Sequence, residues 1–274
     1  MIILVYDRFV NTRFPKVIEA AEEAGEIIRR YFGELLEVEE KTMAADFRTK
    51  ADVDAEAKIL EILAKEYPDY GILSEETGHN GQKSEFQFVI DPLDGTNNFS
   101  LGIPNFSVSI ALQQNERTIF GVIHQPITME TYWAELGRGA WNNSKKLSVN
   151  SENKLPKSTL FSCVGYDNNL KERQILRYNL SGPKAQGLKR WAENWAVAMD
   201  CCLVADGRAE IMVMKGLELH DFAAGKLIAK EAGARSTDLS GEKDDDQSTA
   251  FILSNGTSVH EQVLSAIKLT HYDR

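Results

Sequence analysis

The residues most suited to chemistry lie in one turn, at positions 91–96, read Asp-Pro-Leu-Asp-Gly-Thr. A largely apolar run at 86–90 ends directly at Asp91, so a buried strand would deliver that carboxylate. Asp94 follows after the stiff Pro92, and two carboxylates on one turn can face a hard cation such as Mg²⁺. Gly95 permits a tight turn, and N–H groups near Thr96 would favour a phosphate if a helix begins there. By themselves, these residues are better explained as a capped strand-to-helix turn, because Asp, Gly and Thr are common turn and cap residues.

Three more acidic residues favour the metal interpretation. Glu75 and Glu76 follow the apolar segment 71–74, and a strand there running parallel to 86–90 would place them beside Asp91. Asp221 stands where an Ala-Ala-Gly-rich helix opens, which also suits a plain helix cap. Each of these positions has an ordinary structural explanation, so only their convergence predicts a site.

The elements that must position these residues can be predicted from hydrophobic spacing. Helical spacing at 16–32 and about 53–66 predicts two amphipathic helices, and strand-like runs from 71 to 135 predict an antiparallel meander. After a polar connection at 150–156, we expect strands at 160–164, 209–214 and 251–254, and helices at about 194–205, 222–232 and 259–268. We therefore expect two halves, residues 1–149 and 150–274, that form one catalytic unit.

The composition of the 274-residue chain fits an ordinary globular protein, with 43% hydrophobic and 26% charged residues. Its net charge of −10 argues against nucleic acid and anionic membranes as partners, and it would repel a phosphorylated substrate unless bound cations intervene. An odd number of cysteines without a C-x-x-C pair indicates reduced thiols in a cytoplasmic protein. The run 244–246, Asp-Asp-Asp, is interpreted as a solvated loop.

Several ordered blocks resemble the inositol monophosphatase family. Residues 91–99, D-P-L-D-G-T-N-N-F, are similar to its first signature, and 220–225, H-D-F-A-A-G, to its second signature W-D-x-A-[AG]-G. Further similar blocks are 46–52 (D-x-x-T-x-x-D), 72–76 (the metal-binding G/S-E-E) and 137–141 (G-x-G-A-[FW]). The similarity spans about residues 15–268. It implies an α/β fold, a layered α/β/α/β/α sandwich of the inositol monophosphatase and fructose-1,6-bisphosphatase type.

The resemblance implies two or three Mg²⁺ ions in the site. Glu75, Asp91 and the backbone carbonyl of Leu93 would hold one ion. Asp91, Asp94 and Asp221 would hold a second, and Glu75 with waters would complete a third, weaker site. Inhibition by Li⁺ is also expected from the resemblance.

The resemblance also implies the catalytic and phosphate-binding residues. Gly95 and Thr96 would bind phosphate through backbone N–H groups. The Thr96 hydroxyl, paired with Asp52 and acting together with Glu75, would orient a nucleophilic water. Lys41 lies where the family often carries a lysine near the site. No covalent phosphoenzyme is expected.

The sequence departs from the family where the substrate would be recognised. His220 replaces the tryptophan of the second signature and can be a packed residue, a substrate contact or a neighbour that tunes the following aspartate. Glu193, Asn194 and Trp195 replace small residues of a substrate-facing segment, and Met214 stands where a ring-binding glutamate aligns. These five positions are our candidate substrate contacts, with Lys41.

The leading hypothesis is a magnesium-dependent phosphomonoesterase acting on a small metabolite, with inositol monophosphate as the first candidate substrate. Histidinol-phosphate, fructose 1,6-bisphosphate and 3′-phosphoadenosine 5′-phosphate remain alternatives within the same chemistry. A regulatory or interaction protein that retains the fold is the alternative from another class, although the complete set of acidic residues argues against an inactive enzyme. The resemblance also suggests a homodimer.

Overall fold

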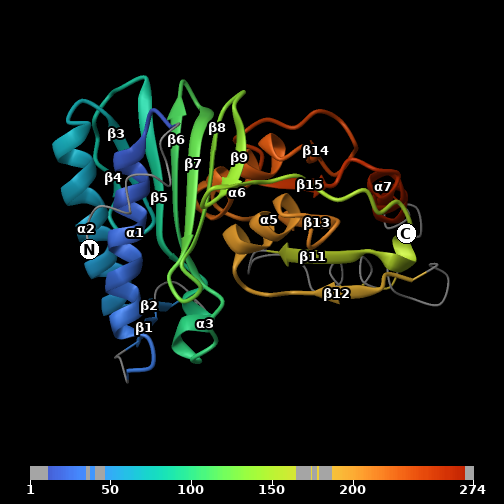
Figure 1. The fold of residues 1–274 in the computed structure, drawn as a ribbon, viewed down its shortest axis with the longest axis horizontal. Helices are drawn as coiled ribbons and strands as arrows, with labels where there is room; N and C mark the ends of the chain where they lie inside the picture. Colours follow the sequence, from blue (N-terminus) through green and yellow to red (C-terminus); the bar gives the residue numbers. More distant parts are fainter. Residues whose placement is uncertain are drawn as a thin grey trace.

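The protein is seen in a computed structural model that describes residues 12–34, 38–40, 47–164, 174, 178 and 187–268. The described elements stack as helices, sheet, helices, sheet and helix (Figure 1). This is the expected α/β/α/β/α sandwich. In this part of the chain, no helix is long and apolar enough to cross a membrane.

The first layer consists of α1 (Pro15–Tyr31) and α2 (Lys50–Glu66), which cover one face of the large sheet (Figure 1). α1 begins at a proline, which suits the first turn because its backbone nitrogen needs no partner there. α2 begins earlier than predicted, because Thr49 and Asp52 form a reciprocal capping box at its first turn. A small antiparallel pair, β1 (Val38–Glu40) and β2 (Phe47–Thr49), lies between the two helices in sequence.

The large sheet has the order β10-β9-β8-β7-β6-β5-β3-β4. The strands from β5 to β10 pair antiparallel with one another, which confirms the predicted meander over residues 86–135. β3, which we also expected in the meander, runs parallel to β5. Their bounds are β3 Gly71–Ser74, β4 Gly78–His79, β5 Phe86–Asp94, β6 Ser107–Gln114, β7 Arg117–Gln125, β8 Glu130–Glu135, β9 Gly139–Asn142 and β10 Lys145–Lys146.

The second sheet has the order β12-β11-β13-β15-β14. It comprises β11 (Thr159–Val164), β12 (Arg190–Ala192), β13 (Ile211–Lys215), β14 (Arg235–Thr237) and β15 (Ala250–Ser254). The short 3₁₀ helix η1 (Leu155–Lys157) precedes it, and α7 (Val259–Lys268) covers its outer face, as predicted. β12 and β14 were not predicted, because each has only three residues and carries an arginine.

The middle layer contains α5 (Val197–Ala205) and α6 (Leu219–Glu231), which lie between the two sheets (Figure 1). One continuous buried cluster joins these helices to Val89 and Ile123 of the large sheet and to Met212 and Phe251 of the second sheet. The core therefore draws on both predicted halves. The division at 149/150 remains a prediction.

One close backbone contact holds α6 against the large sheet. A Cβ atom at Gly121, in β7, would lie 2.9 Å from the Cα and the carbonyl oxygen of Ala224 in α6. Because both obstacles are backbone atoms, neither can turn away.

Gly121→Ala should destabilise the protein by about 1–3 kcal/mol through overpacking, and should weaken function further by displacing α6. Urea unfolding followed by circular dichroism measures the stability change. Gly78→Ala serves as a control for a glycine with open space, since nothing lies within 4 Å of its Cβ position, although its φ of +71° adds local strain. Unchanged stability of Gly121→Ala would contradict the tight contact.

The acidic run 244–246 is not the solvated loop that we predicted. Asp244 is buried and forms an ion pair with Lys226 of α6, which is itself 1% exposed. Asp246 pairs with Lys230 and accepts a hydrogen bond from the backbone N–H of Thr118. The run therefore attaches its loop to α6 and to the large sheet.

Candidate functional site

The parallel pairing of β3 with β5 brings the predicted acidic residues together. Ser74 is registered against Ile90, and the backbone N–H of Glu75 donates to the Ile90 carbonyl at 3.0 Å. Glu75 therefore leaves β3 beside Asp91, as the sequence interpretation required. Glu76 follows in the same turn and raises the pKa of Asp52 through its charge.

Asp91 is almost completely shielded from solvent. It is 2% exposed, and its Oδ1 accepts a hydrogen bond from the Leu93 backbone N–H at 3.0 Å. Burial raises the pKa of Asp91 well above its usual value, and the charges of Glu75, Asp94 and Asp221 raise it further. Asp91 lies within β5 rather than at its end, at an irregularity in the pairing with β6 that spans Asp91 to Asp94.

Asp94 joins the large sheet to the N-terminus of α5. Its Oδ1 accepts from the Val197 N–H, and its Oδ2 accepts from the Ala198 N–H, both at 3.0 Å. Ser107 Oγ also donates to Oδ2, at 3.3 Å. Burial and the Asp221 charge raise the pKa of Asp94, whereas the two N–H groups oppose this rise. Asp94 is therefore an N-terminal cap supplied to α5 from a distant part of the chain.

Asp221 lies in the first turn of α6, and our prediction that the helix begins at this residue was wrong. The helix begins at Leu219, Glu218 is its N-cap, and the Glu218 N–H donates to Asp221 Oδ2 at 2.7 Å. Burial raises the pKa of Asp221 to about 6, although nearby His220 lowers it. His220 Nε2 lies 3.7 Å from Asp221 Oδ1, so this histidine adjoins the carboxylate cluster.

Thr96, at the start of α3, contacts Asp52 in the first turn of α2, although the two residues are 44 positions apart in sequence. Thr96 Oγ1 lies 3.2 Å from Asp52 Oδ1 and 2.9 Å from the Leu93 carbonyl oxygen, and its single proton can serve either acceptor. Burial raises the pKa of Asp52 to about 6, while hydrogen bonds from Thr49 oppose the rise.

The turn between β5 and α3 (Thr96–Ser100) depends on a glycine. Gly95 has φ of +90°, in the left-handed region that disfavours side chains, and a Cβ there would lie 2.9 Å from the Asn105 carbonyl oxygen. Asn98 Nδ2 lies within hydrogen-bonding distance of the carbonyls of Asn105, Asn194 and Trp195. The amide thereby ties this turn to the segment before α5.

The predicted substrate contacts lie in different environments. Asn194 and Trp195 adjoin the Gly95 turn, and Glu193 Oε1 accepts from Ser162 Oγ at 3.4 Å. Met214 is fully buried in the central cluster, so its side chain offers no surface to solvent. Lys41 lies outside the described residues.

Sequence reasoning missed several residues that support these groups. Asn98 carried a detectable signal, because it stands inside the signature-like block 91–99. Ser107, which donates to Asp94, and Asp200 of α5 carried none. Burial raises the pKa of Asp200 to about 7, and Asn194 Nδ2 donates to its Oδ1 at 2.7 Å.

The donor set is chemically suited to a hard divalent cation. Carboxylates and a backbone carbonyl are the ligands that Mg²⁺ and Ca²⁺ prefer, and the mutual charge of four acidic groups favours a cation among them. In the part of the chain that the structure describes, no three His, Cys, Asp or Glu side chains already surround one point as a metal cage. The carboxylates of Asp91 and its neighbours nevertheless repel one another through their like charges until a cation offsets them.

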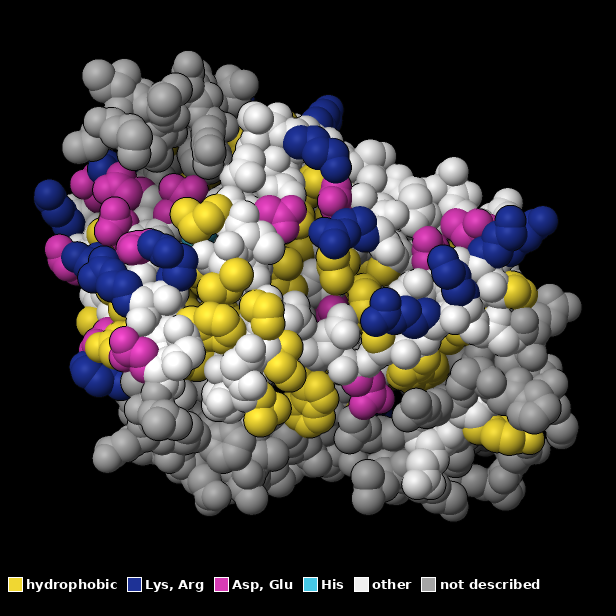
Figure 2. All heavy atoms as spheres, turned by 60° about the horizontal axis from the view of Figure 1, so that its bottom comes forward, with side chains coloured by type: hydrophobic (Ala, Val, Ile, Leu, Met, Phe, Trp, Pro, Cys, Tyr) yellow, Lys and Arg dark blue, Asp and Glu magenta, His cyan; other side chains and the backbone are white. Residues whose placement is uncertain are grey.

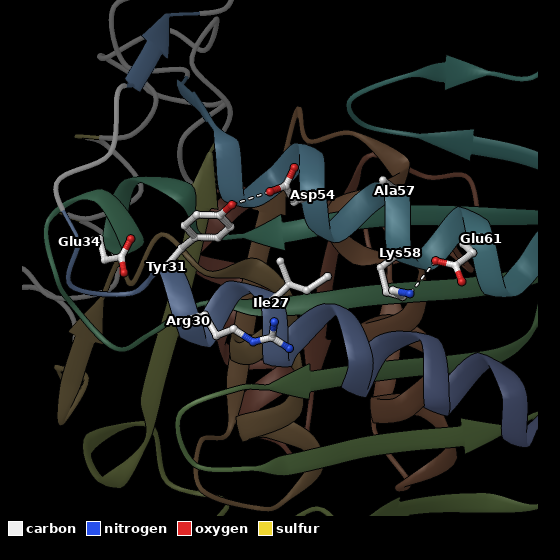
Figure 3. Close-up of a pocket in the computed structure, with 8 residues that line it drawn as sticks. All are labelled: Ile27, Arg30, Tyr31, Glu34, Asp54, Ala57, Lys58 and Glu61. Carbon is white, nitrogen blue, oxygen red and sulfur yellow. Dashed lines mark hydrogen bonds and ion pairs between the residues drawn. The ribbon is translucent and has the colours of Figure 1, made fainter.

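A separate hollow of about 550 Å³ lies between α1 and α2 (Figure 3). Two pairs of its lining side chains are already in contact, since Tyr31 donates to Asp54 at 2.6 Å and Lys58 pairs with Glu61 at 2.6 Å. None of the carboxylates of the candidate site lines it, so we do not assign the chemistry to this hollow. Its lining residues are Ile27, Arg30, Tyr31, Glu34, Asp54, Ala57, Lys58 and Glu61.

Comparison with known proteins decides which family shares this arrangement. A sequence profile described as the inositol monophosphatase family matches residues 12–271. The chain belongs to the inositol monophosphatase family. It is accordingly a phosphomonoester hydrolase, in agreement with the resemblance seen in the sequence.

Named relatives of this inositol monophosphatase family member cover nearly the whole chain. It is 35% identical to an inositol-1-monophosphatase of Caulobacter vibrioides, over 92% of this chain and 99% of that protein. It is 36% identical to the Nus factor SuhB of Haemophilus influenzae, over 84% of this chain and 86% of that protein. The crystal structure of the extragenic suppressor protein suhB of Bartonella henselae superposes with a TM-score of 0.86, at 32% identity, covering 93% of this chain and 98% of that one.

Proposed function

We propose that this protein hydrolyses the phosphate monoester of a small metabolite with the help of Mg²⁺, and that inositol monophosphate is the first substrate to test. The observation that carries the proposal is the buried pair Asp91 and Asp94, with Glu75 and Asp221 close enough to raise the pKa of one or both. Such a concentration of negative charge suits a site that binds cations and, through them, a phosphate.

The proposed ligands follow the donor set. Glu75, Asp91 and the Leu93 carbonyl would hold one Mg²⁺, and Asp91, Asp94 and Asp221 a second; Glu75 would take part in a third. Such ions activate water at neutral pH and offset the charge that develops on the phosphoryl group and on the leaving oxygen.

The protein's own groups would position the reactants. Backbone N–H groups of Gly95 and Thr96 would bind the phosphate oxygens. The Thr96 hydroxyl can donate a hydrogen bond to Asp52 and accept a hydrogen bond from water. It would therefore orient the attacking water together with Glu75. Because water is the nucleophile, no side chain should become phosphorylated.

Metal affinity should fall with acidity, because protons compete for the same carboxylates. The pKa of Asp221 is raised to about 6, and the pKa values of Asp91 and Asp94 are also raised. Below these values the folded protein holds protons that a cation must displace, so lowering the pH from 7.5 to 5.5 should weaken Mn²⁺ binding about tenfold or more. Calorimetry in two buffers of different ionisation enthalpy would detect the released protons. Equal affinity at both pH values would contradict the assignment.

The proposed activity is tested by measuring phosphate release from a panel of phosphomonoesters with Mg²⁺ and with EDTA. The panel contains myo-inositol 1-phosphate, histidinol-phosphate, fructose 1,6-bisphosphate and 3′-phosphoadenosine 5′-phosphate. We expect Mg²⁺-dependent turnover of at least one member, and inhibition of that turnover by Li⁺ is tested in parallel. Turnover that persists in EDTA would exclude the metal-dependent mechanism.

A regulatory role is the second candidate, because a relative at 36% identity is named a Nus factor. If the folded protein releases phosphate from no member of the panel, this role is favoured. The expectation that nucleic acid is not a partner is tested by electrophoretic mobility shift with RNA.

A cytoplasmic location is proposed from the three free cysteines among the described residues.

We also propose a homodimer. The exposed hydrophobic residues Leu101, Ile103, Ile127 and Met129 follow α3 or form the β7–β8 turn, and Gln125 Nε2 donates to the Pro104 carbonyl between them. Figure 2 faces this side of the molecule and shows hydrophobic side chains gathered there. Sedimentation velocity would show the dimer, and Leu101→Glu should weaken it if these residues form the interface.

A further inference from the structure

The backbone is strained at Trp195, two residues before α5 begins at Val197. Trp195 has φ of +54°, a left-handed conformation that is unfavourable for a bulky side chain. Trp195 remains 43% exposed, so the strain is not offset by burying the whole ring in the core. Strain of this kind concentrates at functional sites, where surrounding contacts hold it in place.

The strained residue lies against the proposed phosphate-binding turn. A Cβ on Gly95 would lie 3.2 Å from the Trp195 carbonyl oxygen, and Asn98 Nδ2 lies 3.2 Å from the same oxygen. Two residues later, the Val197 N–H donates to Asp94. The backbone of Trp195 therefore lies at the border of the carboxylate cluster, beside the turn proposed to bind the phosphate, and its side chain is on the protein surface.

The polar groups of Asn194, directly before Trp195, are already engaged within the protein. The Asn194 carbonyl accepts from Asn98 at 2.7 Å and from Asn105 at 3.2 Å, and its side-chain amide donates to Asp200. Glu193 accepts from Ser162, at 3.4 Å. This segment therefore exposes a large aromatic ring next to an asparagine whose carbonyl and amide are already hydrogen-bonded, and Glu193 is the one exposed polar side chain of residues 193–195.

We propose that Trp195 determines specificity by stacking on a flat heteroaromatic ring in the alcohol part of the substrate. The inference rests on the proposed phosphomonoesterase function and narrows its substrate class to phosphomonoesters that carry such a ring. An aromatic platform gains affinity from any π-face placed over it. A polyol is better recognised by several polar groups that pair with its hydroxyls, and the Asn194 carbonyl and amide are already hydrogen-bonded to Asn98 and Asp200.

Trp195→Gly separates stacking from folding, because glycine accepts the positive φ that strains tryptophan. We would compare kcat/KM for two aromatic substrates, histidinol-phosphate and 3′-phosphoadenosine 5′-phosphate, with kcat/KM for myo-inositol 1-phosphate and glycerol 2-phosphate. The wild-type protein should prefer an aromatic substrate. Trp195→Gly should lose about tenfold or more of kcat/KM on that substrate, as removal of a stacking partner does, and much less on the polyol phosphates. Trp195→Phe should restore most of the loss.

Other outcomes overturn the inference in distinguishable ways. A wild-type preference for polyol phosphates, or equal losses on both classes in Trp195→Gly, would refute stacking while leaving the phosphatase function intact. Absence of turnover on all four compounds by the folded wild-type protein would refute the proposed function and this inference with it. Thermal unfolding of each variant confirms that comparisons are made between folded proteins.

Discussion

Asp91→Asn should reduce phosphate release by about a thousandfold or more, since it removes a charge shared by both proposed metal ions. The same change should stabilise the metal-free protein. Asp91 is buried among three other acidic groups that raise its pKa, so a neutral side chain relieves repulsion. Asparagine keeps an oxygen that can accept from the Leu93 N–H.

Asp94→Asn is the informative comparison, because Asp94 has a second role. Both of its oxygens accept backbone N–H groups of α5, and an asparagine would turn its NH₂ group toward one of these donors. This variant should lose activity as well as stability, by roughly 1–3 kcal/mol for the unsatisfied donor. The opposite signs of the two stability changes therefore distinguish a buried charge from a structural cap.

These variants are measured by phosphate release with Mg²⁺ and by urea unfolding in EDTA. Asp54→Asn provides the control: Asp54 is an aspartate of α2 that pairs with Lys50 and Tyr31 on the outer surface. It should leave activity nearly unchanged. Retained activity in Asp91→Asn would exclude Asp91 from the metal site. Destabilisation of this variant without metal would show that groups of the protein already compensate the Asp91 charge.

Asp244→Ala should destabilise the protein by about 3–5 kcal/mol, because it leaves the Lys226 ammonium buried without its partner. Lys226 is 1% exposed, pairs with Asp244 and donates to the Asp245 carbonyl at 2.6 Å. Its Nζ also lies 4.0 Å from the centre of the Phe251 ring. Burial lowers the pKa of Lys226, although Asp244 opposes that change.

Lys226→Met tests whether the cost arises from a stranded charge or from lost packing. Methionine fills a similar volume without a charge, and replacing a buried ion pair by apolar groups is often neutral. The double variant Asp244→Ala, Lys226→Met should therefore be more stable than Asp244→Ala alone. Glu61→Ala, which breaks the exposed pair with Lys58, should cost less than about 1 kcal/mol. A similar small cost for Asp244→Ala would refute the buried-pair account.

Hydrophobic spacing predicted the long elements of the fold because their buried faces recur regularly. It did not predict β12 and β14, whose three residues are too few to show a period. It also misplaced the start of α6, because the cap is a reciprocal contact between Glu218 and Asp221 rather than a single favoured residue. Lys226 and Asp244 read as surface charges, and only the tertiary structure shows that they are buried together.

The candidate site was predictable where several residues of one type follow neighbouring strands. The placement of Glu75 beside Asp91 required a strand parallel to residues 86–90, and β3 is parallel to β5. The cap that Asp94 provides to α5 could not be inferred, because it joins residues 103 and 104 positions apart. The positive φ of Trp195 likewise occurs where Asn98, 97 positions earlier in the chain, contacts its carbonyl, and the local sequence reveals neither feature.

The central claim is that Asp91 and its acidic neighbours bind catalytic divalent cations. The most direct measurement is anomalous diffraction from crystals of the whole chain grown with Mn²⁺ and inorganic phosphate. We predict anomalous peaks in contact with the Asp91 carboxylate, shared with Glu75, Asp94 or Asp221, and a phosphate beside Gly95 and Thr96. Mn²⁺ bound elsewhere, with these carboxylates free of metal in an enzyme that is active under the same conditions, would contradict it.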